Sequence, residues 1–431
     1  MQTSLRGIAN RARKDRSYRF ANLYTMLNRL NLEDSWKTMN RRSAPGVDCE
    51  TVQEYERNFG SNVSDLVERL KRKAYRARLV KRVYIPKGSG KLRPLGLPAT
   101  EDKLVQTAAM RILNAIYEED FLPCSFGYRP NRGMKDSVSE LTSKLHYGSF
   151  EYIVEADIKG FFDHINHDWL IRMLEHRIND RAFIGLIKKW LKAGVLDTDG
   201  KVVHPVSGTP QGGIISPILA NIYLHYVLDL WFEKVVKKHC EGAAYLNRYA
   251  DDFVCAFEYK EDAERFFRAL GNRLAKFGLS IAPEKTRVFR FSRFWPGQER
   301  FDFLGFEFSR GLSRKKRRII KRRTARKKFR ASLRAVHLWL KENRTMRLYD
   351  IVQLLNAKLR GYYEYYGVIG NYESLMTFFY VVKRMLFKWM NRRSQRRSYN
   401  WKSFAQAMDF HPLIRPYITE KPVRQENLAF S

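Results

Sequence analysis

Two adjacent carboxylates, Asp251 and Asp252, separate two apolar runs of this chain. The runs cover residues 243–246 and 253–257, so the pattern predicts a strand–turn–strand hairpin with both acids at its tip. Like charges repel at this separation, and a divalent cation shared with a phosphate-bearing ligand would relieve the repulsion. An ordinary surface turn is the alternative, because Asp is a common turn residue. Other segments of the chain are needed to choose between the two interpretations.

The chain carries a large excess of positive charge. It has 80 Lys and Arg against 45 Asp and Glu, which gives +35 over 431 residues and predicts a polyanionic partner, foremost nucleic acid. A membrane surface is the competing explanation, but no apolar run reaches the length of a spanning helix, and residues 1–19 lack the apolar core of a secretory signal. We therefore expect no membrane association, a cytoplasmic location and four reduced cysteines.

A third acid ends another apolar stretch. Residues 152–157 are rich in apolar and β-branched side chains and predict a strand that ends at Asp157. A functional carboxylate at a strand end and a helix-capping Asp are both compatible with this pattern. Further along, residues 207–213 hold three glycines before an apolar helix expected over 218–230. Such a loop lets a backbone approach a ligand closely, although a tight turn into a helix has the same composition.

Strand-like alternation over residues 79–86 and a return over 91–95 predict a hairpin with a glycine-containing tip, flanked by Lys87 and Arg93. An ammonium and a planar guanidinium are suited to hold a triphosphate, and a solvated turn is the alternative. Helical spacing of apolar residues predicts helices over 63–70, 101–117 and 263–277, and alternation predicts a strand over 301–308.

No acidic residue occurs between Arg310 and Arg334, a segment that we call the basic run. Charge runs are commonly solvated faces or localisation signals, but the length of this one favours binding to nucleic-acid phosphates. The residues expected to bind phosphates are Arg314, Lys315, Lys316, Arg317, Arg318, Lys321, Arg322, Arg323, Arg326 and Lys327.

The order of these segments carries more information than any one of them. Two metal ions about 3.5 to 4 Å apart can activate a 3′-hydroxyl and stabilise a leaving pyrophosphate, and they need carboxylates from separate strands at one sheet edge. Asp157 and Asp251 are suited to bridge both ions, and Asp252 completes the set. In-line phosphoryl transfer then depends on positioning and charge neutralisation.

Taken in this order, the segments resemble the group II intron-encoded reverse transcriptase and maturase family of bacteria and organelles. The resemblance runs across most of the chain. The segments that carry it are residues 40–48, 85–87, 93–96, 125–130, 156–163, 208–217, 248–252 and 303–306.

The resemblance implies an α+β fold, a right-hand polymerase with fingers, a palm of antiparallel sheet plus helices, and an α-helical thumb. Residues 1–50 are expected to form a basic helical N-terminal extension, with Leu23, Leu27 and Leu30 at helical spacing. The expected segments after it are fingers over 51–130, interleaved with the palm, a palm over 131–310, and a thumb or maturase domain over 311–431.

The resemblance also implies roles for single residues. Asp157, Asp251 and Asp252 become ligands of two Mg²⁺ ions, together with the backbone carbonyl of Ile158. Phe161 falls where the family keeps an aromatic ring beneath the sugar, which would exclude a 2′-hydroxyl. The residues implied to bind the nucleotide are Lys87, Arg93, Phe161, Gln211, Tyr249 and Lys285.

The implied function is RNA-directed DNA synthesis from dNTPs on a template–primer, together with binding of a structured group II intron RNA and assistance to its splicing. The chain shows no paired Cys and His cluster of the family's endonuclease, so second-strand cleavage is not expected. One alternative is a domesticated relative in phage defence or DNA repair that works with a dedicated non-coding RNA. Another is a splicing cofactor that no longer polymerises, against which the three intact acids argue. The oligomeric state stays open.

Overall fold

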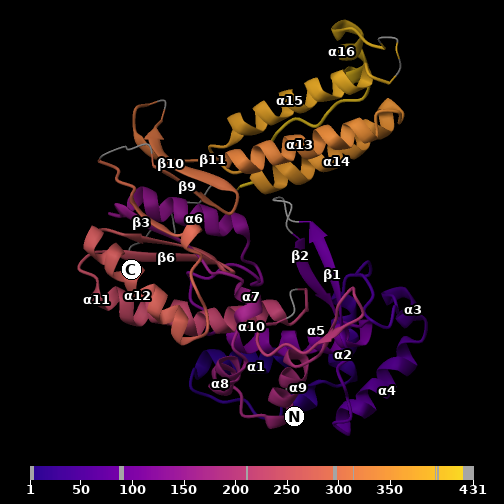
Figure 1. The fold of residues 1–431 in the computed structure, drawn as a ribbon, viewed down its shortest axis with the longest axis vertical. Helices are drawn as coiled ribbons and strands as arrows, with labels where there is room; N and C mark the ends of the chain where they lie inside the picture. The colour runs from indigo at the N-terminus through magenta and orange to yellow at the C-terminus, as the bar shows by residue number, and fades with distance from the viewer. Residues whose placement is uncertain are drawn as a thin grey trace. The chain divides into compact units, whose positions relative to one another are not determined.

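The computed structural model describes residues 4–86, 92–209, 212–294, 299–313, 315–393, 395 and 398–420. The chain divides into two compact units, Met1–Gly133 with Tyr152–Val288 and Met134–Glu151 with Phe289–Ser431. Both combine helices with β-sheet, so the α+β class is confirmed (Figure 1). The units end at other residues than the four expected segments, and the division into fingers, palm and thumb stays a prediction.

The N-terminal segment packs into the core of the first unit. Leu23 and Leu27 are buried there, whereas Leu30 is 60% exposed. The segment is largely helical, as expected, but the three leucines do not share one helix, because the Asn28 side chain accepts a hydrogen bond from the Asn31 amide and caps a new helix after Leu27. The elements are α1 (Leu5–Lys14), η1 (Tyr24–Met26), α2 (Arg29–Thr38), α3 (Val52–Arg57), α4 (Phe59–Lys71) and α5 (Thr100–Tyr117).

A four-stranded sheet of order β6-β7-β3-β8 lies in the first unit, whose last residue, Val288, belongs to β8. The expected hairpin is confirmed, since β6 (Ala244–Tyr249) and β7 (Asp252–Phe257) pair antiparallel around a two-residue turn. β3 (Tyr152–Asp157) pairs with the other side of β7, and β8 spans Arg287–Arg290. The amphipathic helix α12 (Lys260–Lys276) packs its apolar face against β3 and β7.

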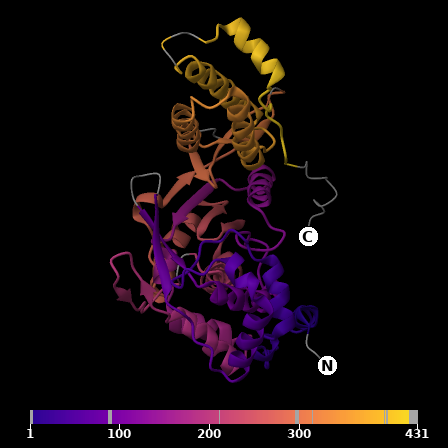
Figure 2. The same cartoon turned by 90° about the vertical axis from the view of Figure 1, so that its right-hand side faces the viewer.

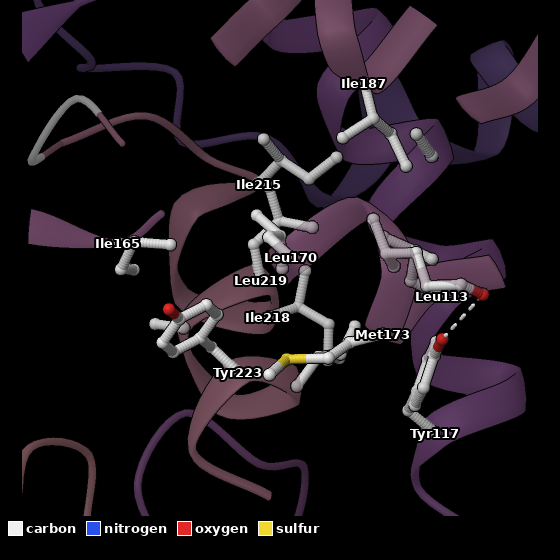
Figure 3. Close-up of a cluster of buried hydrophobic side chains, with 14 of the residues drawn as sticks. Leu113, Tyr117, Ile165, Leu170, Met173, Ile187, Ile215, Ile218, Leu219 and Tyr223 are labelled. Atoms are coloured by element: carbon white, nitrogen blue, oxygen red, sulfur yellow. Dashed lines mark hydrogen bonds between the residues drawn. The ribbon is translucent and has the colours of Figure 1, made fainter. Parts of the chain in front are cut away.

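The main core lies among helices that bring together residues far apart in the sequence, including Leu113, Leu170 and Ile218 (Figure 3). The Tyr117 hydroxyl donates to the Leu174 carbonyl across it at 3.3 Å. The apolar segment expected as one helix over 218–230 is helical, with α10 continuing through the π-helical turn η2, and a second π-helical turn, η3, follows it. The elements are α7 (Phe161–His164), α8 (His167–Glu175), α9 (Arg181–Leu191), α10 (Ser216–Leu224), η2 (His225–Asp229), η3 (Phe232–Val236), α11 (Lys237–His239) and η4 (Pro283–Lys285).

A second sheet in this unit has the order β2-β1-β4-β5. β1 (Val80–Pro86) and β2 (Leu92–Leu97) form the expected antiparallel hairpin, which is long in both views (Figures 1 and 2). β4 (Val195–Leu196) pairs parallel with β1 and antiparallel with β5 (Val202–Val203).

The second unit holds a three-stranded sheet and a helical bundle in which α13, α14 and α15 lie side by side (Figure 1). The strand expected over 301–308 is instead a hairpin, because Leu304 and Gly305 take φ of 50° and 78° and turn the chain. None of the helices in the described part of the chain is both long and apolar enough to cross a membrane. The elements are α6 (Met134–Tyr147), β9 (Arg300–Phe303), β10 (Phe306–Leu312), β11 (Arg318–Thr324), α13 (Arg326–Glu342), α14 (Leu348–Tyr366), α15 (Tyr372–Met390) and α16 (Trp401–Phe410).

Candidate active site and nucleic-acid interface

Three carboxylates gather at one end of the β6-β7-β3 part of the sheet. Asp157 is the last residue of β3 and lies opposite Asp252, the first residue of β7. Asp251 directly precedes Asp252 and lies in the turn that joins β6 to β7. Ala250, the other residue of this turn, has a φ of 58° and is buried, so the turn is a tight, packed structure and not a mobile surface loop.

The electrostatics of this turn indicate crowded negative charge. Burial raises the pKa of Asp251 above its ordinary value, and the nearby charge of Asp157 raises it further. The guanidinium groups of Arg93 and Arg248 oppose this rise in the pKa. Arg93, an exposed residue of β2, is therefore close enough to Asp251 for its charge to act on that acid, and its binding of a triphosphate stays a prediction.

Lys285 already supplies one cation to these acids. Its ammonium forms a hydrogen bond and an ion pair with Asp157, and this bond raises the pKa of Lys285. Among the residues that the structure describes, no three acidic, His or Cys side chains form a ready-made metal site. The acids still suit divalent cations, because a cation relieves the repulsion between their charges. At Asp157 the Lys285 ammonium already acts as such a cation.

Two glycines hold neighbouring loops against the site. A Cβ added to Gly127 would lie 2.3 Å from the Ala250 nitrogen, so only glycine lets this loop touch the acidic turn. The same loop is bonded to β6, with the Phe126 amide donating to the Arg248 carbonyl at 2.9 Å. Gly212 has a φ of 104°, and a Cβ there would lie 2.8 Å from the Gly96 carbonyl oxygen on β2. The loop that contains Gly208, Gly212 and Gly213, which we call the glycine loop, thus packs against the β1–β2 hairpin.

Phe161 does not lie where the resemblance implies. Its side chain is 2% exposed and packs in the core against Phe162 and Tyr223, so it cannot lie beneath a bound sugar. Phe162 is half-buried, and its carbonyl accepts a hydrogen bond from the Thr209 amide of the glycine loop at 2.8 Å. The sequence offers two adjacent rings, and the short helix α7 turns the first into the core and leaves the second partly exposed.

The other residues implied to bind metal or nucleotide are only partly described. Tyr249 is half-buried at the end of β6, and Ile158 is buried in a bridge with Ile281. Their proposed contacts stay predictions. Lys87, Gln211 and Arg314 lie outside the described residues.

The sequence interpretation missed two residues beside the acidic turn. Tyr128 follows Gly127, has a φ of 60° and is 50% exposed, and its pKa is raised by burial and then by the charge of Asp251. Arg248 precedes the turn and is fully buried. Both lie in segments that carried the family resemblance, but a sequence does not reveal which side chains point inward.

The basic run forms a strand hairpin followed by a helix. Most of its expected phosphate-binding residues are exposed in the β10–β11 turn, on β11 and at the start of α13, namely Lys315, Lys316, Arg317, Arg318, Arg323, Arg326 and Lys327. Lys321 is half-buried. The expectation for Arg322 is wrong, because its side chain is buried, forms a bidentate pair with Glu420 and donates to the Ile369 carbonyl.

The acids and the two glycine-dependent loops fall within a match to the reverse transcriptase (RNA-dependent DNA polymerase) family, whose model covers residues 85–308. This match spans more than half of the chain, so the protein belongs to that family. A second match, to the maturase-specific domain of group II introns, covers residues 326–406. Together they confirm the group II intron-encoded reverse transcriptase and maturase family inferred from the sequence.

The chain is also similar to individual curated proteins and to a solved structure. The group II intron-encoded protein LtrA of Lactococcus lactis subsp. cremoris is 44% identical over 173 residues, which are 39% of this chain and 28% of LtrA. Protein YkfC of Escherichia coli (strain K12) is 34% identical over 239 residues, or 49% of this chain and 62% of YkfC. The chain thus spans less than two thirds of either relative. A solved telomerase from Candida albicans, in complex with a fragment of telomeric RNA, covers 83% of this chain and 67% of its own at 14% identity, with a TM-score of 0.44.

Proposed function

We propose that this protein is an RNA-directed DNA polymerase that extends a primer 3′-hydroxyl with deoxynucleotides by in-line phosphoryl transfer. The observation that carries the proposal is the meeting of Asp157, Asp251 and Asp252 at one end of a sheet. The charge of Arg93 acts at the same place, and membership of the reverse transcriptase family supports the same chemistry.

In this proposal Asp157, Asp251, Asp252 and the Ile158 carbonyl would hold two Mg²⁺ ions through oxygen atoms, the ligand type that Mg²⁺ prefers. When bound, the ions activate the primer hydroxyl and neutralise charge on the leaving pyrophosphate. The chain's own contribution is to hold the three carboxylates close together through the pairing of β3, β6 and β7. Lys285 neutralises Asp157 in the free protein, and after leaving that carboxylate its flexible ammonium is suited to bind the triphosphate.

The nucleotide contacts follow from the surrounding loops. Lys87 and Arg93 are proposed to hold the triphosphate, Gln211 to lie along the nascent base pair, and Tyr249 to touch the primer or nucleotide. We transfer the role beneath the sugar from Phe161 to Phe162, because the side chain of Phe162 is partly exposed and its backbone carbonyl is bonded to the glycine loop. A ring in that position collides with a 2′-hydroxyl, so dNTPs are preferred over ribonucleotides.

Primer extension on an RNA template with dNTPs and Mg²⁺ tests the polymerase directly. The wild-type protein should extend the primer, and Asp251→Ala combined with Asp252→Ala should abolish extension. Asp199→Ala is the matched control, since Asp199 is an exposed acid in the β4–β5 loop of the same unit. Full activity in the double variant would overturn the assignment of the acids.

A structured RNA is the proposed partner, and a group II intron RNA whose splicing the protein assists is the favoured identity. The maturase-specific match over 326–406 and the exposed cations at the start of α13 support this. A domesticated reverse transcriptase with a dedicated non-coding RNA would keep the same acids. A splicing cofactor without polymerase activity would not need them.

Sequencing the RNA that copurifies with the protein distinguishes these possibilities. A copurified RNA whose intron domains are encoded on either side of the gene for this protein supports the maturase role. A structured RNA from a separate gene supports the domesticated role. Normal splicing together with undetectable DNA synthesis by the wild-type protein would favour the splicing cofactor.

A further inference from the structure

A fully buried arginine lies directly behind the acidic turn. The side chains of Arg248 and Asp229 are both 0% exposed, and they form a bidentate pair at 2.7 Å and 2.5 Å. Asp229 ends the π-helical turn η2, a type of helical irregularity that is frequent at functional sites. His225 of the same turn lies 4.0 Å from Asp229, but burial lowers its pKa to about 4, so Arg248 supplies the charge that balances Asp229.

All five N–H groups of the guanidinium are used. Besides the two bonds to Asp229, Arg248 donates to Asn221 Oδ1 at 3.0 Å, to Ser125 Oγ at 2.7 Å and to the Ala250 carbonyl at 3.0 Å. Ala250 is the residue before Asp251 in the turn. One side chain therefore connects α10, η2, the loop before Gly127 and the backbone of the acidic turn.

The connection closes on itself through the glycine loop. Asn221 uses its Nδ2 to donate to the Gly127 carbonyl at 2.7 Å, and Gly127 packs directly against Ala250. The turn is thus held by a hydrogen bond from Arg248 on one side and by a backbone contact from Gly127 on the other. The Arg248 side chain makes the first contact itself and is bonded to Asn221, which supports the second.

We propose that Arg248, fixed by Asp229, is a positioning residue that sets the backbone of the Ala250–Asp251 turn for catalysis. A buried ion pair contributes little net stability compared with apolar residues of similar volume, so stability alone does not account for it. A planar fork with five directed donors does account for the bonds to four different elements, and a lysine cannot reproduce it. The proposal rests on the proposed polymerase function for its kinetic consequence, but its structural part can be measured separately.

The test replaces the pair with apolar residues, Arg248→Met with Asp229→Leu, which removes the bond to Ala250 without leaving a buried lone charge. Arg177→Met with Asp120→Leu is the matched control, because this pair is also buried in the first unit, at 3.0 Å, and contacts no part of the acidic turn. Thermal unfolding monitored by circular dichroism shows that each variant is folded.

Two measurements then follow. Without Mg²⁺, hydrogen–deuterium exchange of the peptide over residues 245–257 should become about tenfold faster in the Arg248 variant and stay unchanged in the control. With RNA template, dNTPs and saturating Mg²⁺, kcat should fall about 10- to 100-fold in the Arg248 variant, while KM for dNTP changes less than about threefold. If wild-type protein shows no polymerase activity, the proposed function fails and the exchange measurement still decides the positioning role.

Unchanged exchange at the turn, or kcat within about threefold of wild type, would overturn the proposal. An equal loss in the Arg177 and Asp120 control would also overturn it, because the effect would then reflect general loosening of the fold. If the doubly apolar variant does not fold, Arg248→Lys takes its place. That variant should keep the ion pair and lose part of kcat, and a wild-type kcat in it would overturn the proposal as well.

Discussion

The acidic turn of the first unit and the basic run of the second are both highly charged, but they are built in opposite ways. Asp251 stands in a turn whose backbone is held by the fully buried Arg248 and by Gly127. The cations Lys315, Lys316 and Arg317 lie exposed at a hairpin tip. Phosphoryl transfer needs fixed positions, whereas attraction to a phosphate backbone needs mainly a number of charges. Single changes should therefore have large effects at the turn and graded effects at the basic run.

The largest effect should come from Asp251→Asn, which keeps the side-chain volume and removes the charge. A metal-bound transition state gains several kcal/mol from such a ligand, so kcat should fall on the order of a thousandfold or more. Single-turnover primer extension measures this, with gel-shift titration to check that template–primer binding is kept. A loss of binding with unchanged single-turnover rate would place Asp251 outside the chemistry.

Gly127→Ala should have the next largest effect, although it alters no charge. Its Cβ would meet the Ala250 nitrogen at 2.3 Å, so the turn must shift, and a displacement of about 1 Å can cost roughly a hundredfold in rate. Gly185→Ala in α9 is the control, since its Cβ would meet nothing within 4 Å. That substitution should leave kcat unchanged and stabilise the helix by about 0.5–1 kcal/mol. Equal rates in the two variants would show that the turn tolerates movement.

The acidic turn and the loop at Gly127 also show what the sequence could predict. The apolar runs around Asp251 and the strand ending at Asp157 predicted that carboxylates from separate strands meet at one sheet edge, as they do in the structure. The register of β3 against β7, which places Asp157 opposite Asp252, was not predicted, because the two-residue turn determines only how β6 pairs with β7. The glycines of residues 207–213 predicted close approach of a backbone to a ligand, whereas the contact of Gly127 with Ala250 was not predicted from the sequence.

Burial of single polar or aromatic side chains could not be predicted in the same way. Arg322 stands among exposed cations in the sequence, yet tertiary packing pairs it with Glu420, about a hundred residues away. Phe161 and Phe162 are chemically identical neighbours, and only the orientation of a short helix separates core from surface. The turn at Leu304 and Gly305 was missed although the apolar alternation changes phase there, from Phe301 and Phe303 to Phe306 and Phe308.

Phe162→Ala should have a moderate effect, expressed as a change in sugar selection. If the accessible ring lies beneath the sugar, its removal should raise ribonucleotide use relative to dNTP use by roughly tenfold. Competitive incorporation of each nucleotide type on one template gives this ratio. Phe161→Leu is the control and should leave the ratio unchanged, because Phe161 packs in the core. The opposite result, with only the Phe161 variant relaxed, would restore the role to the buried ring.

The smallest effect should come from Arg317→Ala in the basic run. Removing one phosphate contact should lower the slope of log Kobs against log salt by about 0.7 to 0.9, with less than about a tenfold loss of RNA affinity near 0.1 M salt. Because Arg317 is exposed at a hairpin tip and positions nothing in the acidic turn, kcat should stay at the wild-type value. Arg181→Ala, an exposed cation at the start of α9, should leave the slope unchanged. Filter-binding titrations over a range of salt concentrations measure both. An equal change in the two variants would mean that RNA binding depends on the total positive charge of the surface and not on the basic run. The contrast would then be between the fixed geometry of the acidic turn and the charge of the whole surface.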